Sequence, residues 1–122
     1  MEKLFDSELI VMEPVWEDGP QPAGALAKRL AQSAGWNRNT TYTVIKKLID
    51  KGAVARSDPG FLCTALVSRQ EVQRTETDSL ISRLFGGSRT QFLSAFLSEK
   101  DLTPAEAQQL RELIADFSQE EE

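Results

Sequence analysis

The sequence lacks histidine and holds a single cysteine, Cys63, among its 122 residues. Without histidine the chain cannot form a Ser-His-Asp triad, a Cys-His nucleophile pair or an imidazole zinc site. A single thiol excludes an internal disulfide, so nothing in the sequence argues for secretion. We therefore expect no enzyme activity, no cofactor and no metal site. We also expect Cys63 to be a buried structural thiol rather than a redox switch, because a free cysteine mostly behaves as a small hydrophobic residue.

Long apolar runs are absent too. No stretch approaches the ~18 consecutive apolar residues that a membrane span requires. The first residues, MEKLFDSELIVMEPVW, carry acidic side chains through their apolar part, unlike a signal peptide. The sequence therefore predicts a cytoplasmic protein with no membrane partner.

Charge is present in ordinary amount but is unevenly distributed. The formal net charge of −5 speaks, as an average, against a nucleic-acid partner. Residues 28–56, however, hold seven basic side chains against Asp50 alone, which gives +6. Residues 71–122 hold five basic against eleven acidic side chains, which gives −6. This asymmetry indicates either an anion-binding segment joined to an acidic one or simply a solvated helix face.

Periodicity and turn residues predict three helices and then a β-hairpin in the first half. The expected elements are helices at about 7–17, 23–33 and 37–52, a strand at 53–56, a turn at 58–60 and a strand at 61–66. Ser7 or Asp6 is expected to cap the first helix, and Asn37 the third. Three helices followed by a hairpin is the order of a winged helix-turn-helix, so we expect a mainly α fold with a small β-hairpin.

The second half is predicted to be helical. Capping boxes at Ser68 and Thr103 predict the starts of two helices. The helix that starts at Ser68 is expected to end at Gly86-Gly87, and a shorter helix is expected near 92–97. This gives two regions, a winged-helix domain at 1–68 and a helical dimerisation domain at 69–122. A region this short cannot bury its apolar stripes by itself. We therefore expect it to pair with a second copy of the chain, as a homodimer, rather than to pack on the first domain. The expected dimerisation residues are Leu80, Ile81, Leu84, Phe85, Phe92, Leu93, Phe96, Leu97, Leu110, Leu113, Ile114 and Phe117.

The predicted third helix has the composition of a helix that reads the major groove of DNA. With its apolar stripe turned inward, short hydroxyls, an amide and lysines remain exposed, and these groups suit base edges and phosphates. Basic residues of the preceding helix would lie over the DNA backbone. The predicted DNA-binding residues are Lys28, Arg29, Arg38, Asn39, Thr40, Tyr42, Thr43, Lys46, Lys47 and Arg56. A solvated amphipathic helix, in a winged-helix module that binds another protein and no DNA, is the alternative.

These segments, in order, resemble the penicillinase-repressor family of winged-helix transcriptional regulators, the BlaI/MecI/CopY type. The resemblance rests on Leu9-Ile10-Val11-Met12 with Val15-Trp16, on Trp36, on Thr40 to Leu48 with Lys51-Gly52, on Gly86-Gly87, on Phe92 to Phe96, and on Leu102 to Glu106 with Leu110 and Leu113. It implies a homodimer that binds an inverted-repeat operator in double-stranded DNA and represses transcription, for example of β-lactam resistance or a similar stress response.

The resemblance also implies how such a repressor is released. In relatives that control β-lactam resistance, a membrane sensor protease triggers cleavage of an Asn-Phe bond. The equivalent cleavage point here is Ala95-Phe96, where the phenylalanine matches and the asparagine does not. Copper-sensing relatives carry four clustered cysteines, which this sequence lacks. The wing is the predicted hairpin at 53–66. At its tip, Asp58 lies where relatives often place a basic residue, so contacts of the wing with DNA are left to Arg56.

Overall fold

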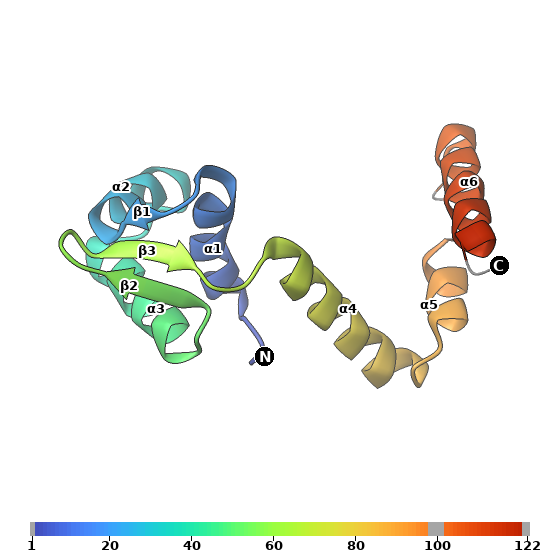
Figure 1. Ribbon diagram of the computed structural model, residues 1–122, viewed down its shortest axis with the longest axis horizontal. Coiled ribbons are helices and arrows are strands. Elements are labelled where there is room, and N and C mark those ends of the chain that lie inside the picture. The colour runs from blue at the N-terminus through green and yellow to red at the C-terminus, as the bar shows by residue number, and fades with distance from the viewer. Residues whose placement is uncertain (1, 98–101, 121–122) are drawn as a thin grey trace. The chain divides into compact units, whose positions relative to one another are not determined.

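The computed structural model describes residues 2–97 and 102–120. Its elements, labelled in Figure 1, are α1 (Asp6–Asp18), β1 (Gln21–Pro22), α2 (Ala23–Ser33), α3 (Arg38–Asp50), β2 (Val54–Ser57), β3 (Leu62–Ala65), α4 (Arg69–Phe85), α5 (Arg89–Phe96) and α6 (Pro104–Glu120). The chain divides into two units, Met1–Thr77 and Asp78–Glu122, and the division falls inside α4. The expected class, mainly α with a winged helix in the first half, is confirmed.

Helix α1 begins one residue earlier than expected and has a different cap. Its N-cap is Phe5, whose backbone N–H donates to Glu8 Oε1 at 2.8 Å. The prediction that Ser7 or Asp6 caps this helix is therefore wrong. A carboxylate three residues into the helix satisfies the N-cap backbone instead, and it also suits the positive end of the helix dipole.

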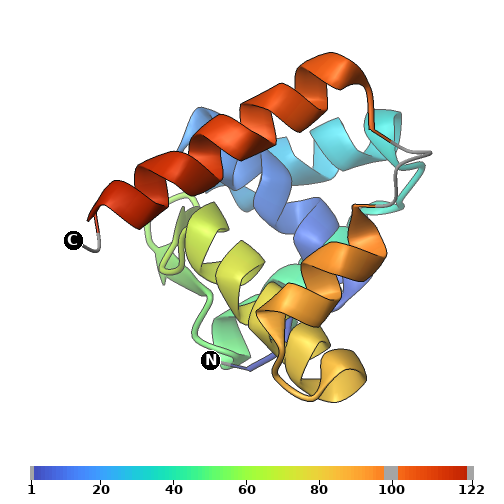
Figure 2. The same ribbon diagram turned by 90° about the vertical axis from the view of Figure 1, so that its right-hand side faces the viewer.

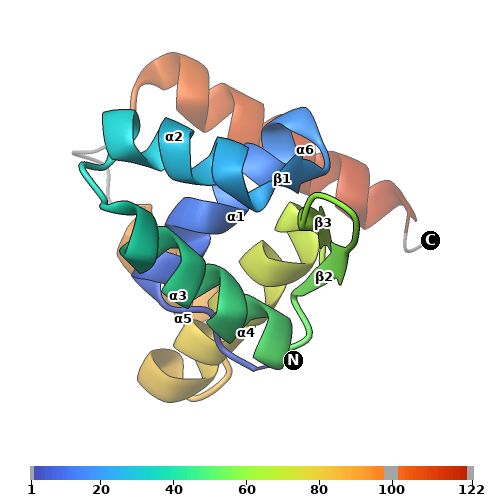
Figure 3. The same ribbon diagram turned by 90° about the vertical axis from the view of Figure 1, so that its left-hand side faces the viewer.

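Helices α2 and α3 form the helix-turn-helix, with α1 packed against both. Figure 3 shows α2 and α3 in front of α1, with the hairpin of β2 and β3 beside them. Asn37 caps α3 as expected, because its side-chain oxygen accepts from the backbone N–H of Thr40 at 2.8 Å. At the other end Gly52 takes a positive φ of 76°, a conformation that a residue with a side chain rarely adopts.

The sheet has three strands rather than the two of the expected hairpin. Strands β2 and β3 pair antiparallel with Arg56 opposite Cys63, and β1 pairs with the other side of β3 with Gln21 opposite Cys63. The order is therefore β1-β3-β2. β1 joins the β3 edge of the wing to the segment between α1 and α2, and β2 is an outer strand of the sheet.

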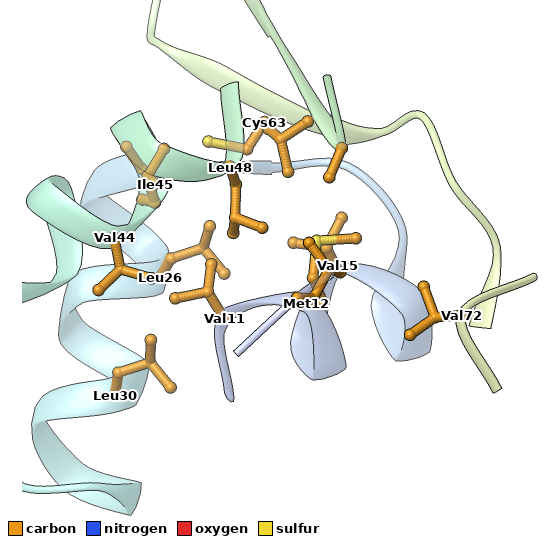
Figure 4. Close-up of a cluster of buried hydrophobic side chains, with 14 residues drawn as sticks. Val11, Met12, Val15, Leu26, Leu30, Val44, Ile45, Leu48, Cys63 and Val72 are labelled. Atoms are coloured by element: carbon orange, nitrogen blue, oxygen red, sulfur yellow. The ribbon is translucent and has the colours of Figure 1, made fainter. Parts of the chain in front are cut away.

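The core of the first unit gathers side chains from all three of its complete helices and from the sheet. Figure 4 shows Val11, Met12 and Val15 of α1 meeting Leu26 of α2 and Leu48 of α3. The start of α4 joins this core through Val72, which is 4% exposed. Trp16 packs at its edge and donates from Nε1 to the Val67 carbonyl oxygen at 2.9 Å. The first turns of α4 thus belong to the first unit.

The thiol of Cys63 lies inside this core. It is 1% exposed, and burial raises the pKa of the Cys63 thiol, with the charge of Arg56 opposing that rise more weakly. Burial disfavours the thiolate, and the thiolate is the reactive form. The expectation of a buried thiol is confirmed.

Alkylation of Cys63 by iodoacetamide is expected to be at least about a hundredfold slower in the folded chain than in urea, because reaction requires the core to open. The measurement is the rate of mass increase at about pH 8, close to the ordinary pKa of a thiol. Free glutathione in the same urea solution controls for effects of the denaturant. Similar rates in the folded and unfolded chain would show that the thiol is accessible.

A buried ion pair joins the start of α1 to the end of α3. Lys51 Nζ lies 2.6 Å from Glu8 Oε1, and the Glu8 side chain is 1% exposed. The same ammonium group donates to the backbone oxygen of Lys3 at 2.8 Å and lies 4.4 Å from the centre of the Phe5 ring. Lys51 is therefore a structural residue of the first unit.

The second unit contains the end of α4, α5 and α6. The chain turns sharply at Gly86-Gly87 before α5, as Figures 1 and 2 show, and both glycines have positive φ. Thr103 Oγ1 accepts from the Glu106 N–H at 3.1 Å, while the Glu106 side chain accepts from the Thr103 N–H at 3.2 Å. This reciprocal pair is the expected capping box of α6. None of the described helices is long and apolar enough to span a membrane.

Candidate nucleic-acid interface

One face of α3 is polar, basic and exposed, while the opposite face forms part of the core. Thr41, Val44, Ile45 and Leu48 are buried. The exposed residues of the helix include Arg38, Asn39, Thr40, Thr43, Lys46 and Lys47. Arg38 and five other predicted DNA-binding residues of α3 are therefore exposed to solvent. The backbone N–H of Thr40 already donates to the side chain of the cap residue Asn37.

Tyr42 differs from its expected place on this exposed face. It is half-buried, and its ring meets Phe61 edge-on with centroids 5.7 Å apart. Arg38 Nη2 donates to the Tyr42 hydroxyl at 3.0 Å, and the Arg38 guanidinium carbon lies 5.0 Å from the Tyr42 ring centre. Tyr42 thus supports Arg38 and contacts the wing.

Three of the seven basic side chains counted in 28–56 are paired with carboxylates. Arg29, expected to point outward, binds Glu17 at 3.0 Å and also Asp18, both on α1. The hydrogen bond to Asp18 is the main cause of the raised pKa of Arg29. Lys51 binds Glu8, as described above, and Arg56 binds Asp58 at 3.2 Å.

The remaining four basic side chains have no carboxylate within ion-pair distance in the part of the chain that the structure describes. They are Lys28, Arg38, Lys46 and Lys47, all exposed. Three of them lie on α3 and the fourth on α2. The unpaired positive charge of residues 28–56 therefore lies on the helix-turn-helix, where a polyanion can contact these side chains without first breaking an ion pair.

The wing holds a residue pair and an aromatic contact that the sequence reasoning missed. Asp58 and Phe61 both contact Arg56, whose guanidinium carbon lies 3.8 Å from the centre of the Phe61 ring. Spacing alone could have indicated the Arg56–Asp58 pair of the wing and the Arg38–Tyr42 contact of α3. Arg56 and Asp58 are two residues apart at the end of a strand, and Arg38 and Tyr42 are four apart on a helix.

The predicted dimerisation residues of the second unit are mostly exposed. Leu84, Leu93, Phe96, Leu113, Ile114 and Phe117 are between 43% and 68% exposed. Leu80, Phe85, Phe92, Leu97 and Leu110 are half-buried, and Ile81 is buried within the single chain. Ala95 and Phe96, the predicted cleavage point, are exposed in the last turn of α5.

An apolar hollow of about 520 Å³ lies beside α6 and is lined by Leu97, Leu102, Thr103, Pro104, Ala107, Leu110, Arg111 and Ile114. It therefore lies next to the exposed apolar side chains of α6. Among the described residues no group of acidic or cysteine side chains is arranged to hold a metal ion.

Comparison with known proteins gives a consistent set of relatives. A family model described as penicillinase repressor matches residues 4–116. The penicillinase repressor of Bacillus licheniformis is 24% identical, over 92% of this chain and 89% of that protein. An uncharacterised 16.5 kDa protein in the ptsI 3' region of Latilactobacillus sakei is 31% identical, over 92% of this chain and 78% of its own length.

Two further relatives bear on regulation and on the fold. The methicillin resistance regulatory protein MecI of Staphylococcus aureus (strain N315) is 21% identical, over 92% of this chain and 93% of its own. The solution structure of the DNA-binding domain of the repressor BlaI superposes with a TM-score of 0.53 at 28% identity, covering 58% of this chain and 93% of that domain.

Proposed function

Because the chain belongs to the penicillinase repressor family, we propose that it is a DNA-binding transcriptional repressor that acts as a homodimer on an inverted-repeat operator. In this proposal α3 enters the major groove, and the second unit pairs two copies so that two helices reach successive half-sites. The similarity to the DNA-binding domain of BlaI, which extends over 58% of this chain, supports the proposal.

The observation that carries the proposal is the unpaired basic face of the helix-turn-helix. Lys46 and Lys47 follow one turn after Thr43, on the same exposed side as Asn39. Lysines at this place can neutralise backbone phosphates, while the amide of Asn39 and the hydroxyl of Thr43 can reach base edges. Arg38, supported by Tyr42, is available for a further phosphate at the start of α3.

The pairing of two copies is supported by the apolar surface of the second unit. Exposed apolar patches of this kind on a soluble domain mark interaction sites, because leaving them in water forfeits their burial energy. A second copy of the same chain presents the same surface, as a two-fold symmetric interface requires. We therefore assign the exposed side chains of α5 and α6 to the dimer interface.

Replacing Lys46 and Lys47 with alanine is expected to lower affinity for DNA by about ten- to thirtyfold at ~0.15 M salt, because two phosphate contacts are lost. The slope of log K against log salt should become shallower by about 1.8 for the same reason. The measurement is fluorescence anisotropy on two labelled duplexes, one from the region upstream of the gene for this protein and one of random sequence, at several salt concentrations.

A double variant, Lys3→Ala with Arg74→Ala, is the matched control, since both side chains are exposed in the first unit and lie outside α2 and α3. It should leave the affinity and the salt slope nearly unchanged. If the Lys46/Lys47 variant keeps the affinity and slope of the unmodified chain, α3 does not contact DNA. If the unmodified chain binds neither duplex, the proposed function is wrong and a protein-binding winged helix becomes the better explanation.

A further inference from the structure

The guanidinium group of Arg56 is held on two sides near the tip of the wing, close to the end of β2. Its face covers the Phe61 ring, with the guanidinium carbon 3.8 Å from the ring centre. One edge meets the carboxylate of Asp58: Nε lies 3.3 Å from Oδ1 and 3.2 Å from Oδ2, and Nη2 lies 3.3 Å from Oδ1. A two-pronged contact of this kind to a carboxylate uses the same donor geometry that an arginine uses to bind a phosphate.

The Phe61 ring is in turn fixed against α3. Tyr42 meets it edge-on, and Tyr42 also contacts the Arg38 guanidinium group through its ring and its hydroxyl. The four side chains Arg38, Tyr42, Phe61 and Arg56 therefore form a continuous chain of contacts from the first turn of α3 to the wing. Because these contacts do not depend on Asp58, Arg56 stays in place when the carboxylate leaves, and little ordering of the side chain is needed for another anion to bind.

We propose that Asp58 is an internal phosphate mimic, which holds Arg56 in the free protein and is displaced by a backbone phosphate when DNA binds. This inference rests on the proposed DNA-binding function and adds to it a residue that lowers affinity. The Arg56 and Asp58 side chains are 47% and 61% exposed, so their ion pair is weak enough for a phosphate to displace it. Displacement leaves the Asp58 carboxylate unpaired near a polyanion, which reduces the gain from each wing contact.

The test is a double-mutant cycle of Asp58→Asn and Arg56→Gln, measured by anisotropy on a labelled random-sequence duplex between about 50 and 200 mM salt. Asp58→Asn alone is expected to raise affinity by about three- to tenfold and to steepen the salt slope by up to about 0.9, because one more phosphate charge is neutralised. In the Arg56→Gln background the same substitution should change affinity by less than about twofold, because no guanidinium group remains for phosphate to reach.

Asp50→Asn is the matched control, because it removes one exposed carboxylate from the end of α3 that has no ion pair among the described residues. It should give a smaller gain than Asp58→Asn, equal in both backgrounds. Circular dichroism melting verifies that each variant is folded.

Two results would overturn the inference. An equal gain from Asp58→Asn with and without Arg56 would show simple repulsion of phosphate, and no gain would show that Asp58 does not compete. If the proposed function itself is wrong, neither the unmodified chain nor any variant, Asp58→Asn included, will bind a duplex. The inference about Asp58 is then wrong as well. If DNA binds but the two Asp58→Asn gains are equal, the repressor proposal survives and only the mimic is wrong.

Discussion

Replacing Leu113 and Phe117 of α6 with serine is expected to convert the proposed homodimer to a monomer and to lower its affinity for the proposed inverted-repeat operator by about a hundredfold or more. The two side chains lie one helical turn apart and are 53% and 61% exposed in the single chain. Their removal therefore costs the pairing of two copies without removing core contacts of either copy. Once the copies separate, the second winged-helix domain is no longer held near its half-site at a high effective concentration, and this accounts for the loss of affinity.

Sedimentation equilibrium gives the oligomeric state, and anisotropy on the upstream duplex gives the affinity. Gln109→Ser with Asp116→Ser is the matched control, because both are exposed polar positions of the same helix and bear the same helix-propensity cost. The control should remain a dimer. A Leu113/Phe117 variant that stays dimeric would remove this face of α6 from the interface, and a monomer of undiminished affinity would show that pairing does not contribute to binding.

Replacing Lys51 with methionine is expected to lower the free energy of unfolding by about 3 kcal/mol, because it leaves the Glu8 carboxylate buried without a partner charge. Glu8 is 1% exposed, and its second carboxylate oxygen has no hydrogen-bond partner among the described residues. Adding Glu8→Gln should recover most of the loss, since a neutral amide still accepts from the Phe5 N–H and costs far less to bury.

Urea denaturation followed by circular dichroism measures these differences. Lys47→Met is the matched control, because that side chain is exposed one turn earlier on α3 and forms no ion pair within the described residues. It should change stability by less than about 0.5 kcal/mol. Lys51→Met and Lys47→Met variants of equal stability would show that the pair with Glu8 does not hold α1 to α3.

Local rules predicted the parts of the fold whose determinants lie close together in the sequence. Asn37 caps α3 through the N–H three residues on, and Thr103 and Glu106 satisfy each other's backbone at the start of α6. Helices α3 and α6 begin where the sequence indicated for that reason. Strand β1 was missed because two residues carry no periodicity, and its pairing with Leu62 and Cys63 is made by residues about forty positions away.

The same distinction holds for the binding face. The alternation of apolar and polar residues along 38–50 was enough to identify α3 as the helix with an exposed polar and basic side, because helical period alone decides which side chains face the core. That period could not show that Tyr42 contacts Phe61, since the ring contact joins a helix to the turn before β3, nineteen residues later.

The sequence by itself determined that this protein has no histidine, one thiol and a basic segment between residues 28 and 56, and it thereby excluded histidine-dependent catalysis and indicated an anion-binding helix. Only the tertiary structure decided which of those seven basic charges are unpaired. Arg29, Lys51 and Arg56 are held by carboxylates, and two of the three find theirs on α1, outside the segment that carries the charge. Net charge sums over positions in the chain, whereas an ion pair depends on distance in space, and folding alone sets that distance.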